Sequence, residues 1–246
     1  MILKNKNILI TGGGKGIGEE CIKNFTSKGG FVFAIIRKKK DFKKFKLLKD
    51  IKLYNGNADN KSLIIKILKD SRSIKRPINS VVNNAGLRFR KGFTKIQKIE
   101  LEKIFKTNFF TPFMIMQEFS KFAIKNKISG SVVNITSIVG QLGFEELSGY
   151  ASSKGALNSL TKSYAAEMSK FGLRANNVSP GFVKTSFYKN FKERKRKLYN
   201  WTLSRIPQKR WGEKKEVAEL ISFILSEKSN YLNGETITID GGWTNA

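Results

Sequence analysis

The 246-residue sequence contains no histidine and a single cysteine, Cys21. Without imidazole, catalysis by a Ser-His or Cys-His pair is excluded, and so is any metal site that needs histidine. One cysteine allows neither a disulfide within the chain nor a zinc site built from several cysteines, so no metal centre is expected. Acid–base catalysis near neutral pH would have to use tyrosine, lysine or a carboxylate with a shifted pKa.

Acidic residues are scarce: 19 Asp and Glu stand against 47 Lys and Arg, which gives a formal net charge of +28. Clustered cations would favour nucleic acids or acidic substrates, but the basic residues of this chain are spread along its whole length. We therefore interpret the charge mainly as a bias in amino-acid usage that places lysine on solvated surfaces. An acidic substrate is the second interpretation, and nucleic acid, which is not expected as a partner, is the third.

Long hydrophobic runs are absent, since no apolar stretch approaches the ~20 residues that span a bilayer. The first residues contain no apolar region of the signal-peptide type and lead directly into a short apolar run. We expect a cytoplasmic protein with no membrane partner. With 4 prolines, no linker-like stretch and no break in composition, residues 1–246 are expected to form one domain.

Short apolar runs alternate with helical patterns along the chain. Strands are expected at 8–11, 31–36, 51–54, 80–84, 130–136, 175–179 and 235–240, and helices at about 16–27, 61–70, 101–125, 149–170 and 213–225. Continuous apolar runs are typical of strands that are covered on both faces. Because strand and helix alternate with short connections, we predict an α/β fold, a three-layer, doubly wound parallel sheet.

A glycine-rich turn joins the first expected strand to the first expected helix. It reads Thr11-Gly12-Gly13-Gly14-Lys15-Gly16-Ile17-Gly18. Glycines let the backbone approach a pyrophosphate closely, and the free N–H groups of the following helix can hold it. The turn lacks the Gly-Lys-Ser/Thr ending of a triphosphate loop, so a dinucleotide is favoured. The candidate cofactor-binding residues of this turn are Gly12, Gly14, Lys15, Gly16, Ile17 and Gly18.

The end of the second strand distinguishes the two nicotinamide dinucleotides. An acidic residue there would bind the adenosine ribose hydroxyls of NAD, whereas a basic residue accommodates the 2′-phosphate of NADP. Here the strand meets Arg37-Lys38-Lys39-Lys40, and the first acidic residue, Asp41, comes too late. Together with Lys15, Arg37 predicts NADP(H) as the cofactor, with NAD(H) as the alternative.

Tyr150 and Lys154 are four residues apart in a helical stretch and therefore project from one face. A cation one turn away stabilises a phenolate, so we expect Lys154 to lower the pKa of Tyr150 towards neutrality. This pair would supply the acid–base group of a chain without histidine. Two further polar segments end expected strands nearby: Ser137, and the run Asn83-Asn84-Ala85-Gly86.

Taken together and in this order, these motifs resemble those of the short-chain dehydrogenase/reductase family over essentially the whole chain. Further motifs of that family in this sequence are Asn108 in Lys-Thr-Asn-Phe-Phe, the run Ser179-Pro-Gly-Phe-Val-Lys-Thr185, and Asp240-Gly-Gly near the C-terminus. The resemblance implies a Rossmann fold and an NAD(P)-dependent oxidoreductase acting on a carbonyl or a secondary alcohol.

The resemblance also implies a catalytic set of Asn108, Ser137, Tyr150 and Lys154. Tyr150 would exchange a proton with the substrate oxygen, and Ser137 would hydrogen-bond that oxygen. Lys154 would bind the nicotinamide ribose, and Asn108 would hold a water that relays protons. The implied cofactor contacts, besides the glycine-rich turn, Arg37, Tyr150 and Lys154, are Asn57, Ala58, Asn84, Ala85, Gly86, Pro180, Gly181, Val183 and Thr185.

Substrate recognition in the family resides in three variable regions: the loop after Gly86, residues 137–150, and a covering segment at about 186–210. The candidate substrate-binding residues are Arg88, Arg90, Ser137, Gln141 and Phe144. Arginines near the site suggest a small polar, acidic hydroxy or keto substrate, such as the sugar acid of a gluconate 5-dehydrogenase.

Other assignments stay open. The chain also resembles 3-oxoacyl-[acyl-carrier-protein] reductases, whose acidic protein partner would suit the charge, but Ile128 and Phe171 stand where those enzymes carry partner-binding arginines. A scaffold that binds NADP(H) or nucleic acid without catalysis is a further alternative, which the full catalytic set argues against. The resemblance implies a homotetramer assembled through two long helices and the C-terminal strand, with a dimer as the alternative because the subunits repel one another. One helix carries Phe109, Phe110, Phe113, Met114 and Phe119, and the other carries Ala151, Gly155 and Ala156.

Overall fold

A computed structural model, which describes residues 1–185 and 188–245, contains one seven-stranded sheet. The strands are β1 (Asn7–Thr11), β2 (Phe31–Ile36), β3 (Ile51–Asn55), β4 (Ser80–Asn83), β5 (Gly130–Ile135), β6 (Leu173–Pro180) and β7 (Thr236–Ile239). Every strand pair is parallel, in the order β3-β2-β1-β4-β5-β6-β7. The predicted doubly wound parallel sheet is therefore confirmed.

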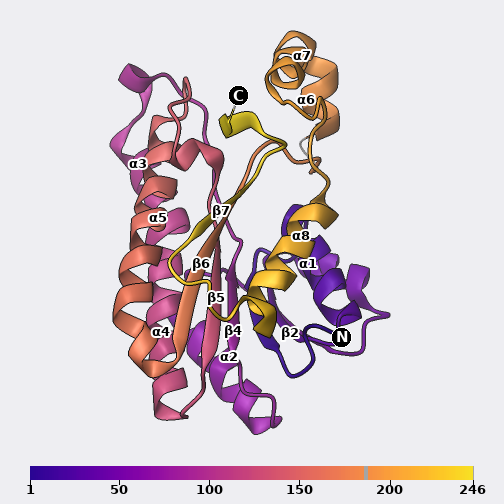
Figure 1. Cartoon of the computed structure of the whole chain (residues 1–246), viewed down its shortest axis with the longest axis vertical. Helices are drawn as coiled ribbons and strands as arrows, with labels where there is room; N and C mark the ends of the chain where they lie inside the picture. The colour runs from indigo at the N-terminus through magenta and orange to yellow at the C-terminus, as the bar shows by residue number, and fades with distance from the viewer. Residues whose placement is uncertain (186–187, 246) are drawn as a thin grey trace.

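Helices cover both faces of this sheet (Figure 1). They are α1 (Gly16–Ser27), α2 (Lys61–Ser73), α3 (Lys98–Phe105), α4 (Thr111–Lys125), α5 (Ser148–Met168), α6 (Tyr188–Arg194), α7 (Arg196–Arg205) and α8 (Lys214–Leu225). The apolar sides of α1 and α8 pack on one face, and those of α2, α4 and α5 pack on the other. Among the helices of the described residues, none has the length and apolar character needed to cross a bilayer.

The residues of each strand point alternately to the two faces, and the strands from β1 to β6 contribute to two separate cores. In β1, Ile8 and Ile10 pack against α1 and α8, whereas Leu9 between them packs against α2 and α4. All three side chains are fully buried. This two-sided burial explains why the strands read as continuous apolar runs rather than as alternating patterns.

The helix expected at 101–125 contains a wider turn. The chain forms α3, then a π-helical turn over Lys106–Phe110, and then α4 without a break in direction. Such turns insert one extra residue per turn and are frequent at functional sites. This one contains the buried Asn108, which the motif analysis singles out.

A row of buried polar side chains crosses the sheet on the α5 side. Asn83, Asn134 and Asn177 are paired in register on β4, β5 and β6. The amide of Asn83 donates to Asn134 (2.8 Å), and that of Asn134 donates to the hydroxyl of Thr161 on α5 (2.8 Å). Thr161 in turn donates to Asn177 (2.6 Å), which donates to Thr236 on β7 (2.9 Å). Because each side chain in the row is hydrogen-bonded to the next, the row fixes how β4, β5, β6 and β7 are aligned with one another.

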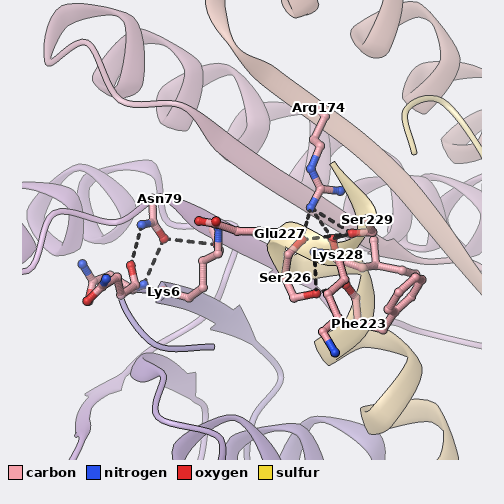
Figure 2. A network of polar contacts seen from close by, with 12 residues as sticks. Lys6, Asn79, Arg174, Phe223, Ser226, Glu227, Lys228 and Ser229 are labelled. Atoms are coloured by element: carbon pink, nitrogen blue, oxygen red, sulfur yellow. Dashed lines mark hydrogen bonds and ion pairs between the residues drawn. The ribbon is translucent and has the colours of Figure 1, made fainter. Parts of the chain in front are cut away.

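The C-terminal end of α8 is held by a half-buried arginine (Figure 2). Arg174 on β6 donates to the carbonyl oxygens of Ile224 and Ser226 and to the Ser229 hydroxyl. Burial lowers the pKa of Arg174 to about 10. The guanidinium thus supplies donors to the last carbonyls of a helix, which have no partner within the helix itself.

The pair α6 and α7 stands beyond the carboxyl end of the sheet, close to the C-terminus of the chain (Figure 1). It joins the sheet through a third apolar cluster that includes Ile138, Phe191, Trp211 and Trp243. Most of the covering segment expected at 186–210 is therefore helical; residues 186–187 lie outside the described part of the chain.

Candidate active site

The geometry of the glycine-rich turn favours glycine at several positions, of which Gly12 and Gly18 are examples. Gly12 has a φ of +68°, which lies in the left-handed region. A Cβ added to Gly18 would lie 2.4 Å from the carbonyl oxygen of Gly12, so any side chain there would displace the turn. Helix α1 begins at Gly16, and the preceding Lys15 provides no side-chain cap. The first N–H groups of α1 are thus left to a ligand at the turn.

Asn84 and Ala85, which follow β4, are hydrogen-bonded to this turn. The Asn84 amide donates to the carbonyl oxygens of Thr11 (3.0 Å) and Gly12 (3.2 Å). The backbone N–H groups of Asn84 and Ala85 both donate to the Thr11 hydroxyl, at 3.1 Å and 3.0 Å. The polar segments after β1 and β4 therefore form one rigid unit, although 73 residues separate Thr11 from Asn84.

Ser137, Tyr150 and Lys154 meet at the carboxyl end of β5. Ser137 follows that strand and lines the same cavity as Tyr150. Lys154 follows Tyr150 by one turn of α5, and its Nζ lies 5.9 Å from the centroid of the phenol ring. The buried Lys154 ammonium donates to the carbonyl oxygen of Ile135 (2.6 Å). The three groups that the motifs singled out are thus close together.

Burial determines the ionisation of this pair. It raises the pKa of Tyr150, and the charge of Arg88 and the hydrogen bond from Ser137 act in the opposite direction. Burial also lowers the pKa of Lys154 to about 8. The sequence-based expectation that Lys154 brings the Tyr150 pKa down towards neutrality is therefore wrong for this structure, because desolvation of the phenol outweighs its nearby cations.

Asn108 braces the loop that follows Gly86. Its side-chain oxygen accepts from the N–H of Leu87 (2.8 Å), and its amide donates to the carbonyl oxygen of Leu87 (2.9 Å) and to Ser153 (3.0 Å). A Cβ added to Gly86 would lie 3.7 Å from the Asn108 oxygen and 3.9 Å from the Lys154 Nζ. The Asn108 side chain therefore holds the backbone near Lys154.

A cavity of about 500 Å³ opens beside the Tyr150 phenol. Its cofactor side is lined by Ile17 from α1 and by four residues that follow or end β6, namely Pro180, Gly181, Val183 and Thr185. Thr185 lies near Gly16, since a Cβ there would be 3.7 Å from the Thr185 methyl. The cavity thus joins the glycine-rich turn to Ser137 and Tyr150.

The expected adenosine-binding residues lie at the carboxyl ends of β2 and β3. Lys15, Arg37 and Asn57 are exposed there, and Ala58 is half-buried. A short 3₁₀ helix over Lys39–Phe45 folds back over the glycine-rich turn. It brings Asp41, which the sequence suggested was too distant, to 3.1 Å from where a Cβ of Gly14 would lie. Lys44 pairs with that carboxylate at 3.4 Å.

Of the five candidate substrate-binding residues, the fold brings four to the cavity and leaves one outside its lining. Arg88, Arg90, Ser137 and Phe144 all line the cavity. Gln141 is exposed and is not among the described residues that line it. The physical reason is local, because Gln141 closes the 3₁₀ turn Ile138–Gly140 and its side chain lies beyond that turn.

Several aromatic residues of the cavity were not identified from the sequence. Phe182, Phe191 and Trp211 line it together with Trp201. Trp243, near the C-terminus, packs behind this wall, with its ring 5.1 Å from Phe182 and 5.4 Å from Trp201. The density of aromatic residues between 182 and 211 was the available signal, but their convergence with residue 243 depends on the tertiary fold.

Comparisons with known proteins agree with this geometry. Residues 12–244 match the family described as enoyl-(acyl carrier protein) reductase. The chain is 32% identical to a 3-oxoacyl-[acyl-carrier-protein] reductase of Thermotoga maritima, covering 98% of this chain and 99% of that protein. It is 29% identical to the 5-keto-D-gluconate 5-reductase of Escherichia coli K12, covering 98% and 96%.

Solved structures show the same fold with dinucleotides bound. The structure of ElxO with NADP bound aligns with a TM-score of 0.91 at 29% identity, covering 98% of this chain and 99% of that one. A Tyr-to-Phe variant of ElxO is complexed with NADPH, and another structural neighbour is complexed with NADH. The fold of this chain is thus shared with proteins that bind NADP, NADPH or NADH.

Proposed function

This chain belongs to the short-chain dehydrogenase/reductase family, and we propose that it is an NADP(H)-dependent oxidoreductase that interconverts a carbonyl and a secondary alcohol. The observation that carries the proposal is that Ser137 and Tyr150 line one cavity together with Ile17 of the glycine-rich turn. Spectrophotometric measurement of NADPH consumption with a panel of carbonyl compounds tests it. Absence of turnover, together with salt-sensitive binding of nucleic acid, would instead favour a non-catalytic scaffold.

The residues present fit the dinucleotide. The uncapped N-terminus of α1 offers N–H groups to a pyrophosphate, and Gly18 permits close packing of the turn. Pro180, Gly181, Val183 and Thr185, which line the cavity, would cover the nicotinamide, and Lys154, Asn84, Ala85 and Gly86 would contact the cofactor as well. When bound, the cofactor would exchange hydride with the substrate carbon.

Tyr150 is proposed to transfer the proton. Because burial raises its pKa, the phenol is protonated at neutral pH and can donate to a carbonyl oxygen that becomes an alkoxide. The Ser137 hydroxyl would hydrogen-bond the same oxygen and so hold it within reach. The Lys154 ammonium and Arg88 would stabilise the phenolate that forms, since both are cations near the ring.

The pH dependence of carbonyl reduction should reflect Lys154. Its pKa of about 8 lies below the ordinary value of a lysine, so the ammonium is present at neutral pH and is lost as the pH rises through 8. We expect kcat/KM for reduction to stay level near neutral pH and to decline above about pH 8, where the Tyr150 phenol is still protonated. A profile of kcat/KM against pH checks this, and a rate that rises through pH 8 would contradict it.

The basic residues near the adenosine side support NADP over NAD. Arg37 follows β2 and Lys15 lies in the glycine-rich turn, both exposed and able to approach a 2′-phosphate. Lys44 forms ion pairs with Glu19 (3.0 Å) and Asp41 (3.4 Å), which offset the charge of the acidic groups close to the turn.

Arg37→Asp should therefore reverse the cofactor preference. Replacing the cation by a carboxylate repels the 2′-phosphate, and we expect the ratio of kcat/KM for NADPH to that for NADH to fall by about 100-fold, the effect of losing a charge-assisted bond. Steady-state kinetics with both cofactors measure it, with Arg72→Met on the exposed face of α2 as the control. An unchanged ratio would place the 2′-phosphate elsewhere.

For the substrate we propose a small hydroxy or keto acid. The two arginines of the cavity support an anionic group, and a relative that acts on 5-keto-D-gluconate supports a sugar acid. The similarity to a 3-oxoacyl-[acyl-carrier-protein] reductase keeps an acyl thioester as the alternative. A comparison of kcat/KM for free keto acids with kcat/KM for acyl thioesters distinguishes the two substrate classes.

We also propose that the protein is a homo-oligomer, a tetramer by resemblance. Phe110 and Phe113 at the start of α4 are 59% and 45% exposed, whereas Phe119 on the same helix is fully buried. Exposed phenylalanines on one side of a long helix support an interface with another copy. The mass determined by light scattering tests this assembly.

A further inference from the structure

The ammonium group of Lys44 lies against the glycine-rich turn. It donates to the carbonyl oxygen of Gly14 (2.6 Å) and to the carboxylate of Glu19 on α1 (3.0 Å). Its third contact is the ion pair with Asp41, at 3.4 Å, on the same 3₁₀ helix. A single cation therefore connects the turn, the first helix and the segment that follows β2.

The Asp41 carboxylate lies where the turn meets the end of β2. A Cβ added to Gly14 would lie 3.1 Å from the Asp41 Oδ2 and also 3.1 Å from the Cγ2 of Ile36, the last residue of β2. In dinucleotide-binding folds an acidic residue after this strand binds the ribose 2′-hydroxyl of NAD. The side chain of Asp41 is 23% exposed, so a ligand at the turn can reach it. The fold thus brings Asp41 close to the place of that acidic residue, although it comes later in the sequence.

The two carboxylates that Lys44 contacts differ in their other partners. Glu19 also pairs with Lys23 at 2.8 Å. Among the residues that the structure describes, no lysine or arginine other than Lys44 lies within 4.0 Å of the Asp41 carboxylate. Burial acts to lower the pKa of Lys44, but the hydrogen bonds to Glu19 and Asp41 raise it above the ordinary value, so the ammonium is charged at neutral pH. Loss of Lys44 would therefore leave Asp41, and not Glu19, without an ion pair.

From these contacts we infer that Lys44 sets the preference for NADP(H) by balancing the charge of Asp41. A bare carboxylate beside the turn would accept hydrogen bonds from the ribose hydroxyls of NAD and would repel a 2′-phosphate. With Asp41 paired to Lys44, the basic residues Lys15 and Arg37 can attract the 2′-phosphate without that repulsion. The inference rests on the proposed function and deepens it, since it names the residue that allows an acidic group to lie in an NADP site.

Nucleotides that carry no nicotinamide test this inference without catalysis. Adenosine 2′,5′-bisphosphate contains the 2′-phosphate, and 5′-AMP lacks it. In Lys44→Met we expect the dissociation constant for the bisphosphate, measured by titration calorimetry, to rise about tenfold or more, the order of one charge contact near a protein surface. The dissociation constant for 5′-AMP should stay within a factor of about three, because losing an exposed ion pair by itself costs little. An equal loss for both nucleotides would mean that Lys44 only supports the turn, and would overturn the inference.

Removal of the Asp41 carboxylate should reverse the effect. The double variant with Lys44→Met and Asp41→Asn has neither charge, and we expect its dissociation constant for the bisphosphate to return to within about threefold of the wild-type value. If binding stays as weak as in Lys44→Met, Lys44 acts on the 2′-phosphate by itself and the role of Asp41 is refuted. Lys43→Met, at the neighbouring exposed lysine of the same 3₁₀ helix, is the matched control and should leave the binding of both nucleotides unchanged.

The wild-type protein separates this inference from the proposed function. If it binds 5′-AMP as tightly as the bisphosphate, the NADP(H) assignment fails and the inference fails with it. If no carbonyl compound is reduced although the variants bind the two nucleotides as expected, only the oxidoreductase proposal fails. If NADPH supports carbonyl reduction and Lys44→Met binds the bisphosphate as the wild type does, only the assignment of Lys44 fails.

Discussion

Tyr150→Phe should abolish carbonyl reduction while leaving the protein folded and able to bind NADPH. The substitution removes one oxygen from the cavity and keeps the ring, whose centroid lies 5.9 Å from the Lys154 Nζ. A positioned proton donor contributes about 10²–10⁴-fold to the rate, so we expect kcat to fall by at least about 100-fold. Steady-state kinetics give kcat, and fluorescence of bound NADPH gives the dissociation constant.

The same helix offers a matched control. Tyr164 on α5 is also buried and its hydroxyl lies 2.7 Å from that of Ser120, away from the cavity. Tyr164→Phe should lower stability slightly and leave kcat unchanged. Turnover by Tyr150→Phe above about a hundredth of the wild-type rate would refute the role of the phenol as proton donor.

The second large effect is expected on stability. Asn134 lies at the centre of the polar row across β4, β5 and β6, fully buried and bonded to Asn83 and Thr161. Asn134→Leu keeps the size of the side chain but leaves the Asn83 amide and the Thr161 hydroxyl without that partner. An orphaned buried polar group costs about 1–3 kcal/mol, so we expect the free energy of unfolding to fall by about 2–5 kcal/mol.

Urea unfolding followed by circular dichroism measures this change. Asn230→Leu, the same substitution at an exposed position, is the control and should change stability by about 0.5 kcal/mol or less. A loss below about 1 kcal/mol for Asn134→Leu would show that the polar row is no better than a leucine in this core.

Much of the fold and of the candidate site could be predicted from local sequence patterns. The alternation of apolar runs and helical patterns was sufficient for the parallel sheet, because the central strands are buried on both faces. Motifs at the ends of successive strands were sufficient to place Asn84, Ser137 and Pro180 at one edge, since the carboxyl ends of parallel strands meet there. The π-helical turn at Asn108 was not predictable, because its wider hydrogen bonding has no distinct residue pattern.

The sequence by itself determined the class of fold, the glycine-rich turn and the absence of histidine from the catalytic group, because these depend on residue type and spacing along one segment. The tertiary structure decided the ionisation of Tyr150 and Lys154, since desolvation depends on what surrounds a group rather than on its neighbours in sequence. It also decided the character of the substrate cavity. Phe144, Phe191 and Trp201 come from separate segments, and only folding brings them against one wall.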